Sequence, residues 1–206
     1  MNKRSAFSFV GVYMSLELLN ALASLLTVCI IAATAIAAMV QLRHLRAGNQ
    51  INAMLAIGEE LSSKSITEAM TLLRHRLPAM ADDPKFRDYN YRADRAEAQE
   101  IIPEYEELRE AASLVGNSYE ELGILVKQGI VDKDIFLDRY SWVILRYWNL
   151  IVKALVDARE ATGQAAIWEN FEYLAVLSED WLREHPSLYP EGMRRMPLPQ
   201  RPPMNS

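Results

Sequence analysis

The chain contains one long apolar run, and its other apolar residues recur mostly at helical spacing. From Leu18 to Leu42, 25 residues pass without a formal charge, between Glu17 and Arg43. At about 1.5 Å of rise per residue, roughly 20 apolar residues cross the hydrocarbon core of a bilayer. The pattern therefore predicts a transmembrane helix over residues 18–42, preceded by a leader over residues 1–17.

The same run leaves two alternatives open. A cleaved signal peptide is suggested by the basic pair Lys3 and Arg4 and by the small residues at 33–37, which resemble a cleavage site. However, the run is much longer than the ~7–15 apolar residues of a signal core. The second alternative is a buried helix of a soluble oligomer. We take a retained single span as the prediction, with the lipid bilayer as its first partner.

Basic residues lie on both sides of the predicted span. Arg43, His44 and Arg46 follow it, and the basic pair at residues 3–4 precedes it. Positive charge close to a span favours the cytoplasmic side, so the two flanks nearly balance. A translation start at Met14 would remove the N-terminal pair. We expect a single-pass protein of the inner (plasma) membrane with its C-terminal domain in the cytoplasm.

The pattern after the span predicts further helices. Apolar residues at three-to-four spacing predict a helical stalk over residues 43–64. A serine and a glutamate at positions 65 and 68 form a capping box that predicts a new helix, ending at Pro78. The turn-forming residues within 80–92 predict a loop there.

Four more helical segments are expected in the second half of the chain. Residues 94–114 form an acidic helix that we expect Gly116 to end, and residues 118–128 form a short helix that ends at a glycine. A longer helix over 132–162 begins at an aspartate cap, and the last one covers 164–184.

The predicted fold is all-α, with a transmembrane helix that continues into a stalk and then a small bundle of about four or five helices. Six of the nine prolines lie at or after Pro186, which predicts an extended tail. The predicted domains are a leader (1–17), a transmembrane helix (18–42), a stalk (43–64), a helical bundle (65–185) and a proline-rich tail (186–206).

Composition narrows the classes of function. The net charge of −5 argues against binding of the whole chain to nucleic acid. The single cysteine, Cys29, excludes an intramolecular disulfide and a cysteine-based zinc site. We find no nucleophile elbow, phosphate loop or dinucleotide fingerprint, so we predict no catalytic residue, no metal, no cofactor and no small-molecule substrate.

The carboxylates give the clearest candidate surface. Glu97, Glu100, Glu104 and Glu107 recur at three-to-four spacing, so on one helix they would share a face. Residues 94–121 carry nine acidic and two basic side chains. Such a face is typical of a solvated helix surface, and it also suits docking of a basic protein partner. Binding of a divalent cation or acid–base chemistry is a more remote alternative.

Two aromatic residues and four small residues complete the candidate contacts. Trp142 and Tyr173 lie off the main apolar stripes of the last two long helices, so we expect them to be exposed and to contact a partner. Ala33, Thr34, Ala37 and Ala38 form overlapping pairs of small residues four apart in the span. These pairs favour close packing of membrane helices in a homo-oligomer, although they also suit an ordinary alanine-rich span.

Two motifs resemble a known family. The first, Val40-Gln41-Leu42-Arg43-His44-Leu45-Arg46, leaves the predicted span. The second is Tyr119–Asp132, which reads YEELGILVKQGIVD and is followed by Tyr147-Trp148. Together they resemble an uncharacterised bacterial family of small, single-pass membrane-anchored proteins with a helical domain of unknown function, from about Leu18 to Trp181. The resemblance implies the anchor-and-bundle architecture and implies no catalytic residue.

These observations lead to three hypotheses about function. The first is a non-enzymatic binding or scaffold protein that presents its cytoplasmic bundle to a protein partner. The second is an oligomerising membrane sensor or effector subunit. The third, more remote, is a metal-dependent hydrolase that uses the carboxylates at 97–107.

Overall fold

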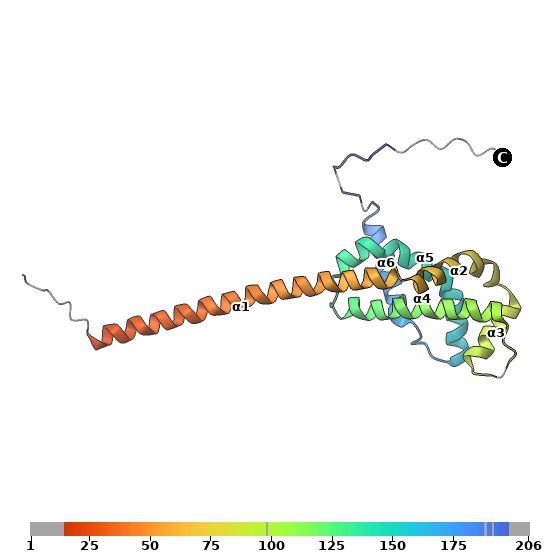
Figure 1. Cartoon of the computed structure of the whole chain (residues 1–206), viewed down its shortest axis with the longest axis horizontal. Helices are drawn as coiled ribbons and strands as arrows, with labels where there is room; N and C mark the ends of the chain where they lie inside the picture. The colour runs from red at the N-terminus through yellow and green to blue at the C-terminus, as the bar shows by residue number, and fades with distance from the viewer. Residues whose placement is uncertain (1–14, 98, 188, 191, 198–206) are drawn as a thin grey trace, which may run out of the picture. The chain divides into compact units, whose positions relative to one another are not determined.

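The computed structural model describes residues 15–97, 99–187, 189–190 and 192–197. Within these residues it contains helices and no strand, which confirms the all-α class (Figure 1). The chain divides into two units, residues 1–49 and 50–206. The predicted boundaries of span, stalk and bundle stay predictions. The helices are α1 (Leu16–Leu61), α2 (Lys64–Met80), α3 (Pro84–Asp94), α4 (Pro103–Lys127), α5 (Lys133–Thr162) and α6 (Glu169–Glu184).

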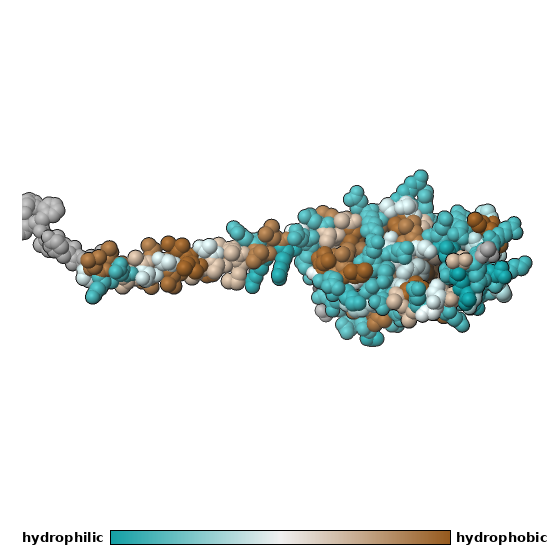
Figure 2. Space-filling view, turned by 90° about the horizontal axis from the view of Figure 1, so that it is seen from below, coloured by the Kyte–Doolittle hydropathy of each residue, from teal (hydrophilic) through white to brown (hydrophobic). Residues whose placement is uncertain are grey.

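The first unit contains the long apolar run as part of α1. The most apolar window of 18 residues has a mean hydropathy of 2.4, and none of it is buried. Its surface is coloured as hydrophobic along the helix in Figure 2. The hydroxyl groups of Thr27 and Thr34 each donate to the carbonyl four residues earlier, at 2.8 Å, which satisfies them within the helix. By length and composition this segment suits a membrane span, and a signal sequence meets the same criteria. Residues 1–14 of the predicted leader, with Met14, lie outside the described residues.

The second unit starts with the last turns of α1 and continues into α2. The Ser63 side chain, and not the predicted Ser65, accepts from the backbone N–H of Ile66 and caps α2. The helix also passes Pro78 and ends at Met80, so the predicted end at the proline was wrong by two residues. The proline lies in the last turn, where little helix remains for it to disrupt.

The predicted loop over residues 80–92 was wrong, because most of it forms α3. The Asp83 carboxylate accepts from the backbone N–H of Lys85 at 2.9 Å, and Pro84 occupies the first helical turn. Aspartate followed by proline is a turn signal and is equally a helix-start signal. Here the apolar residues that follow decide the outcome, because Phe86 and Tyr89 are buried in the bundle.

Helix α4 begins at Pro103 and runs unbroken through Gly116 and Ser118 to Lys127. The predicted start at residue 94 and the predicted break at Gly116 were therefore both wrong. Gly116 serves packing instead of ending the helix, because a Cβ there would lie 2.4 Å from the Trp168 indole. A Cβ at Gly123 would lie 2.3 Å from the backbone oxygen of Asn170. The two glycines let the start of α6 approach α4 closely.

Helix α5 follows the prediction closely. It begins after Asp132, whose carboxylate accepts from two backbone N–H groups, and ends at Gly163 in the left-handed conformation (φ +69°). Helix α6 begins at Glu169 and not at residue 164. The Glu120 carboxylate caps it from α4, because it accepts from the backbone N–H groups of Asn170 and Phe171, each at 2.9 Å. A cap supplied from another helix is not visible in local sequence.

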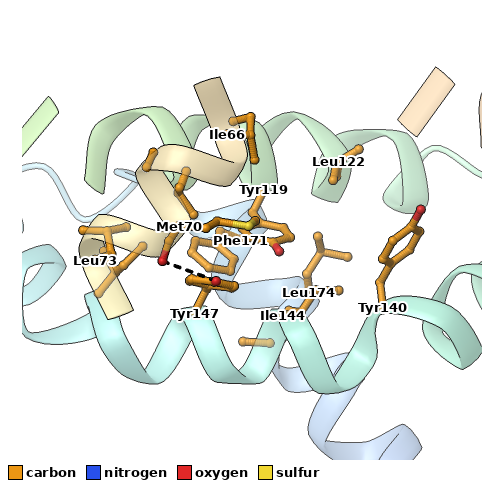
Figure 3. Packing of buried hydrophobic residues seen from close by; sticks show 14 of the residues in the cluster. Ile66, Met70, Leu73, Tyr119, Leu122, Tyr140, Ile144, Tyr147, Phe171 and Leu174 are labelled. Atoms are coloured by element: carbon orange, nitrogen blue, oxygen red, sulfur yellow. Dashed lines mark hydrogen bonds between the residues drawn. The ribbon is translucent and has the colours of Figure 1, made fainter. Parts of the chain in front are cut away.

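The core lies where α2, α4, α5 and α6 meet, as Figure 3 shows. Tyr119 and Phe171 stack there, with their ring centroids 4.8 Å apart. The Tyr147 hydroxyl donates to the backbone oxygen of Met70 at 3.4 Å. In the second unit, Ile57 near the end of α1 is also buried in this core. The described part of the C-terminal tail, up to residue 197, contains no helix or strand.

Candidate functional site: a groove and a cavity in the helical unit

The predicted four-glutamate face does not form. Glu97 and Glu100 lie in the connection before α4, while Glu104 and Glu107 lie on the helix. The helix starts later than predicted because Pro103 occupies its first turn. The prediction that all four carboxylates share one helix face was therefore wrong. Within the part of the chain that the structure describes, no group of three or more His, Cys, Asp or Glu side chains is placed to hold a metal ion.

The two glutamates on α4 are bridged by a basic residue from α2. Arg76 donates to Glu104 Oε1 and to Glu107 Oε2, each at 2.7 Å. The hydrogen bonds that Arg76 donates to Glu104 and Glu107 raise the pKa of its guanidinium. This exposed pairing joins α2 to α4, and it leaves these two carboxylates partly neutralised.

A groove lies between α2 and α4, next to the pairing of Arg76 with Glu104 and Glu107, and its lining is also acidic. Its volume is about 760 Å³. The small side chains Ala69 and Ala111 are buried and keep its floor low, while Leu72 and Leu114 supply further apolar surface. Three glutamates and no Lys or Arg are among its lining residues. The lining is Ser65, Thr67, Glu68, Ala69, Thr71, Leu72, Glu107, Glu110, Ala111 and Leu114.

The two aromatic residues predicted to contact a partner differ in their exposure. Trp142 is 60% exposed on α5, and the Arg146 guanidinium lies over its ring at 5.3 Å. Tyr173 is half-buried against the core, so its predicted exposure was wrong. On α1, the small residues Ala33, Thr34, Ala37 and Ala38 are all exposed. Their role in packing of membrane helices stays a prediction.

A cavity among α2, α3, α4 and α5 was not predicted at all. Its volume is about 160 Å³. Three walls of the cavity are rows of side chains that recur every four residues along a helix. The row on α3 is Phe86, Asn90 and Asp94, and the row on α5 is Ala154, Ala158 and Thr162. Helix α4 supplies two pairs, Leu108 with Ala112 and Arg109 with Ser113. Leu77 on α2 and Ile167 and Trp168 before α6 complete the lining. The α3 row was hidden because that segment was predicted as a loop.

Comparison with known families places most of the chain in an uncharacterised family. Residues 28–181 match the model of a family described as "Domain of unknown function (DUF4760)". The match covers about three quarters of the 206-residue chain, so the chain belongs to this family. This agrees with the resemblance to an uncharacterised family. No curated protein and no solved structure matches the chain.

Proposed function

We propose that this protein is a membrane-anchored binding protein whose helical unit receives a basic, amphipathic helix of a partner protein in the groove between α2 and α4. The observation that carries the proposal is the lining of that groove. It combines an apolar floor with three glutamates, and it contains no Lys or Arg. Recognition of an amphipathic helix in an apolar groove needs this combination when the partner helix has a basic face.

The two parts of the groove would act differently. The floor around Leu72 and Leu114 would supply most of the affinity, because burial of apolar surface is the main favourable contribution to protein association. Exposed charges add little affinity by themselves, but they speed association and exclude acidic partners. The partner's basic face would therefore decide which helix enters, and its apolar face would decide how long it stays.

The three glutamates are not equivalent. Glu107 is already bonded to Arg76 at 2.7 Å. Glu68 lies 3.8 Å from Lys64, and both side chains are exposed, so that pairing is weak. Glu110 forms no ion pair among the described residues. We expect Glu110 and Glu68 to contribute most to selection of the partner.

The location of the protein is part of the same proposal. The apolar run of α1 would anchor the chain in the inner (plasma) membrane. With a translation start at Met14, the basic residues that follow the run, Arg43, His44 and Arg46, would favour a cytoplasmic helical unit. Anchoring would confine partner binding to the membrane surface. The function that we propose is binding, without enzymatic activity.

Site-specific photocrosslinking of the full-length chain in cells tests the proposal. A photoreactive residue replaces Leu114, which lies in the groove and is 40% exposed. The matched control replaces Ile124, which is on the same helix, 44% exposed and outside the groove. We expect one foreign protein to crosslink at position 114 and not at position 124. We also expect the adduct to decrease when Glu68→Gln and Glu110→Gln are combined.

Two outcomes would contradict the proposal. Equal yields of the same adduct from both positions would mean that the groove does not select the partner. Crosslinks only between copies of this chain would favour the oligomerising sensor instead. The glutamate variants should also melt at the same temperature as the unchanged protein, which excludes a loss of adduct caused by misfolding of the helical unit.

A further inference from the structure

The cavity beside α3 exists because large and small side chains line it together. Phe86 is on the α3 wall, while two alanines, Ala154 and Ala158, form part of the α5 wall. A row of alanines at four-residue spacing removes side-chain volume along one line of a helix. The resulting space of about 160 Å³ is close to the size of cavities that admit one benzene-sized ring, roughly 150 Å³. Protein interiors contain few voids larger than one water molecule, so a space of this size is a feature to be explained.

The Trp168 side chain is held in the cavity wall by a strained backbone. Trp168 has a left-handed conformation (φ +51°), which is rare for a residue with a large side chain. Its indole N–H donates to Asn117 Oδ1 at 2.8 Å, and the missing side chain of Gly116 leaves room for the ring. Strain of this kind persists where the surrounding structure imposes it, and it is concentrated at functional sites such as ligand clamps. These three features fix an aromatic ring at the cavity.

Most polar groups of the lining are already bonded within the protein. The Asp94 carboxylate accepts from the Arg109 guanidinium at 3.0 Å, so the two charges in the lining cancel. The Thr162 hydroxyl donates to the backbone oxygen of Ala158 at 2.8 Å. The Asn90 Oδ1 atom has almost no accessible surface. A cavity water needs two to four polar partners, and a charged ligand needs a free opposite charge, so this lining suits neither.

We propose that this cavity binds a small uncharged molecule that consists of one aromatic ring or a similarly compact apolar body. The ring would lie against Phe86 and the Trp168 indole, which line the cavity from α3 and from the connection before α6. Burial of its apolar surface would provide the affinity, and aromatic rings pack favourably against one another. Charged molecules of the same shape would be excluded, because burial removes their hydration without supplying a free partner. The cavity shares no lining residue with the groove between α2 and α4, so the two sites can be tested separately.

The test uses the full-length chain in lipid nanodiscs at pH 7 and four probes. Benzyl alcohol is the uncharged probe with one ring, while benzylamine and benzoate are charged probes of similar shape. The fourth probe, 4-phenylbenzyl alcohol, is uncharged and more apolar but has two rings, so it reports partitioning into the lipid. Calorimetry measures binding, with empty nanodiscs as the blank.

We expect benzyl alcohol to bind and to raise the melting temperature of the helical unit. Benzylamine and benzoate should bind at least about tenfold more weakly. The two-ring probe should give no binding beyond the blank, because the cavity is too small for it. Equal binding of a charged probe would overturn the assignment of an uncharged ligand. Absence of binding by benzyl alcohol, or equal binding of the two-ring probe, would overturn the site itself.

A substitution that fills the cavity locates the binding. Ala158→Met should abolish binding of benzyl alcohol, and the unliganded variant should melt at the same or a higher temperature, because it fills empty space. Val156→Met is the matched control, since Val156 is on the same helix, 55% exposed and outside the cavity lining. Unchanged affinity in Ala158→Met would place the bound molecule elsewhere and contradict the proposal.

A smaller substitution in the same row of α5 covers the case in which methionine does not fit. If Ala158→Met melts at a lower temperature, overpacking is a second explanation for its loss of binding. Ala154→Val adds less volume, so it should keep the melting temperature and still weaken binding of benzyl alcohol by about tenfold. Normal binding of benzyl alcohol by a stable Ala154→Val variant would overturn the placement of the ligand against α5.

Discussion

The two units of this chain use the same residue types in opposite ways. In the first unit, Ile31 is 63% exposed, and its apolar neighbours along α1 are exposed as well. In the second unit, Leu73 and Leu108 are completely buried. The difference lies in sequence pattern. Residues 18–42 are apolar on every side of the helix, whereas α2 and α4 carry apolar residues on one side. An all-round apolar helix needs an apolar medium, and a one-sided helix needs only neighbouring helices.

Helix α1 contains both cases along its length. Its exposed apolar run ends near residue 42, and Ile57 is buried in the core of the second unit. Burial is therefore set by the sequence pattern and the surroundings of a residue, and not by its hydrophobicity alone.

The largest effect is expected from charge in the apolar run. Changing Ile30 and Ile31 together to arginine should remove the protein from the membrane fraction, because each arginine at the centre of a span costs roughly 2.5–3.5 kcal/mol. Membrane fractionation with alkaline extraction measures the outcome. Val176→Arg, at an exposed apolar position on α6, is the control and should have no effect. If both variants fractionate as the unchanged protein does, α1 is not a membrane span.

The next largest effect is expected from truncation of a side chain in the core. Leu73→Ala removes a fully buried side chain and should lower the free energy of unfolding of the helical unit by about 2–5 kcal/mol. Ile31→Ala is the matched change in the exposed run and should leave that free energy almost unchanged. Urea unfolding followed by circular dichroism compares the two. Similar losses from both variants would contradict the separation of the chain into two different apolar environments.

The close approach of α6 to α4 gives a third prediction. Gly116→Ala should destabilise the fold by about 1–3 kcal/mol, because its methyl group would collide with the Trp168 indole. Gly48→Ala is the control, since Gly48 also lies within a helix but a Cβ added there would have no atom within 4 Å. That variant should be neutral or more stable, by up to about 1 kcal/mol. Thermal melts of both variants decide whether α6 is held as closely as described.

The smallest effect concerns the hydroxyl group of Tyr119, which is buried and has no partner among the described residues. Burial raises the pKa of Tyr119 well above its ordinary value. The unfolded chain then loses this proton first, at about pH 10, so stability falls as the pH rises above that value. Tyr119→Phe should unfold less readily above pH 10 and be about as stable at pH 7. Urea melts at pH 7 and pH 10.5 test this, and a steeper alkaline loss in the variant would contradict it.

The sequence predicted best where the signals were local. Helix α5 was predicted almost to the residue, because Asp132 and Gly163 are adjacent to its ends. The start of α6 was missed because its cap, Glu120, comes from another helix. Gly116 was predicted to end a helix because glycine often does so in local sequence. Its actual role, packing against Trp168, depends on a residue 52 positions later. Contacts between distant segments leave no periodic signal in a single sequence.

The candidate sites show the same limit. The density of acidic residues predicted an acidic surface. Which glutamates share a helix face depends on where α4 begins, because Glu97 and Glu100 lie before its first residue. The small residues at 33–38 were visible in sequence, and nothing in the bundle bears on their role. The cavity depends on rows from three helices that meet only in the folded chain. One row, at Asn90 and Asp94, could have been found by interpreting Asp83-Pro84 as a helix start.

The position of Trp168 gives the cavity a built-in optical reporter. Its indole N–H donates to Asn117 Oδ1 at 2.8 Å, which fixes the ring, and the side chain lines the cavity. The other tryptophans, at positions 142, 148 and 181, are not part of that lining. A molecule that enters would change the surroundings of one ring among four. Occupancy would therefore appear as a shift in emission wavelength, without any label added to the chain.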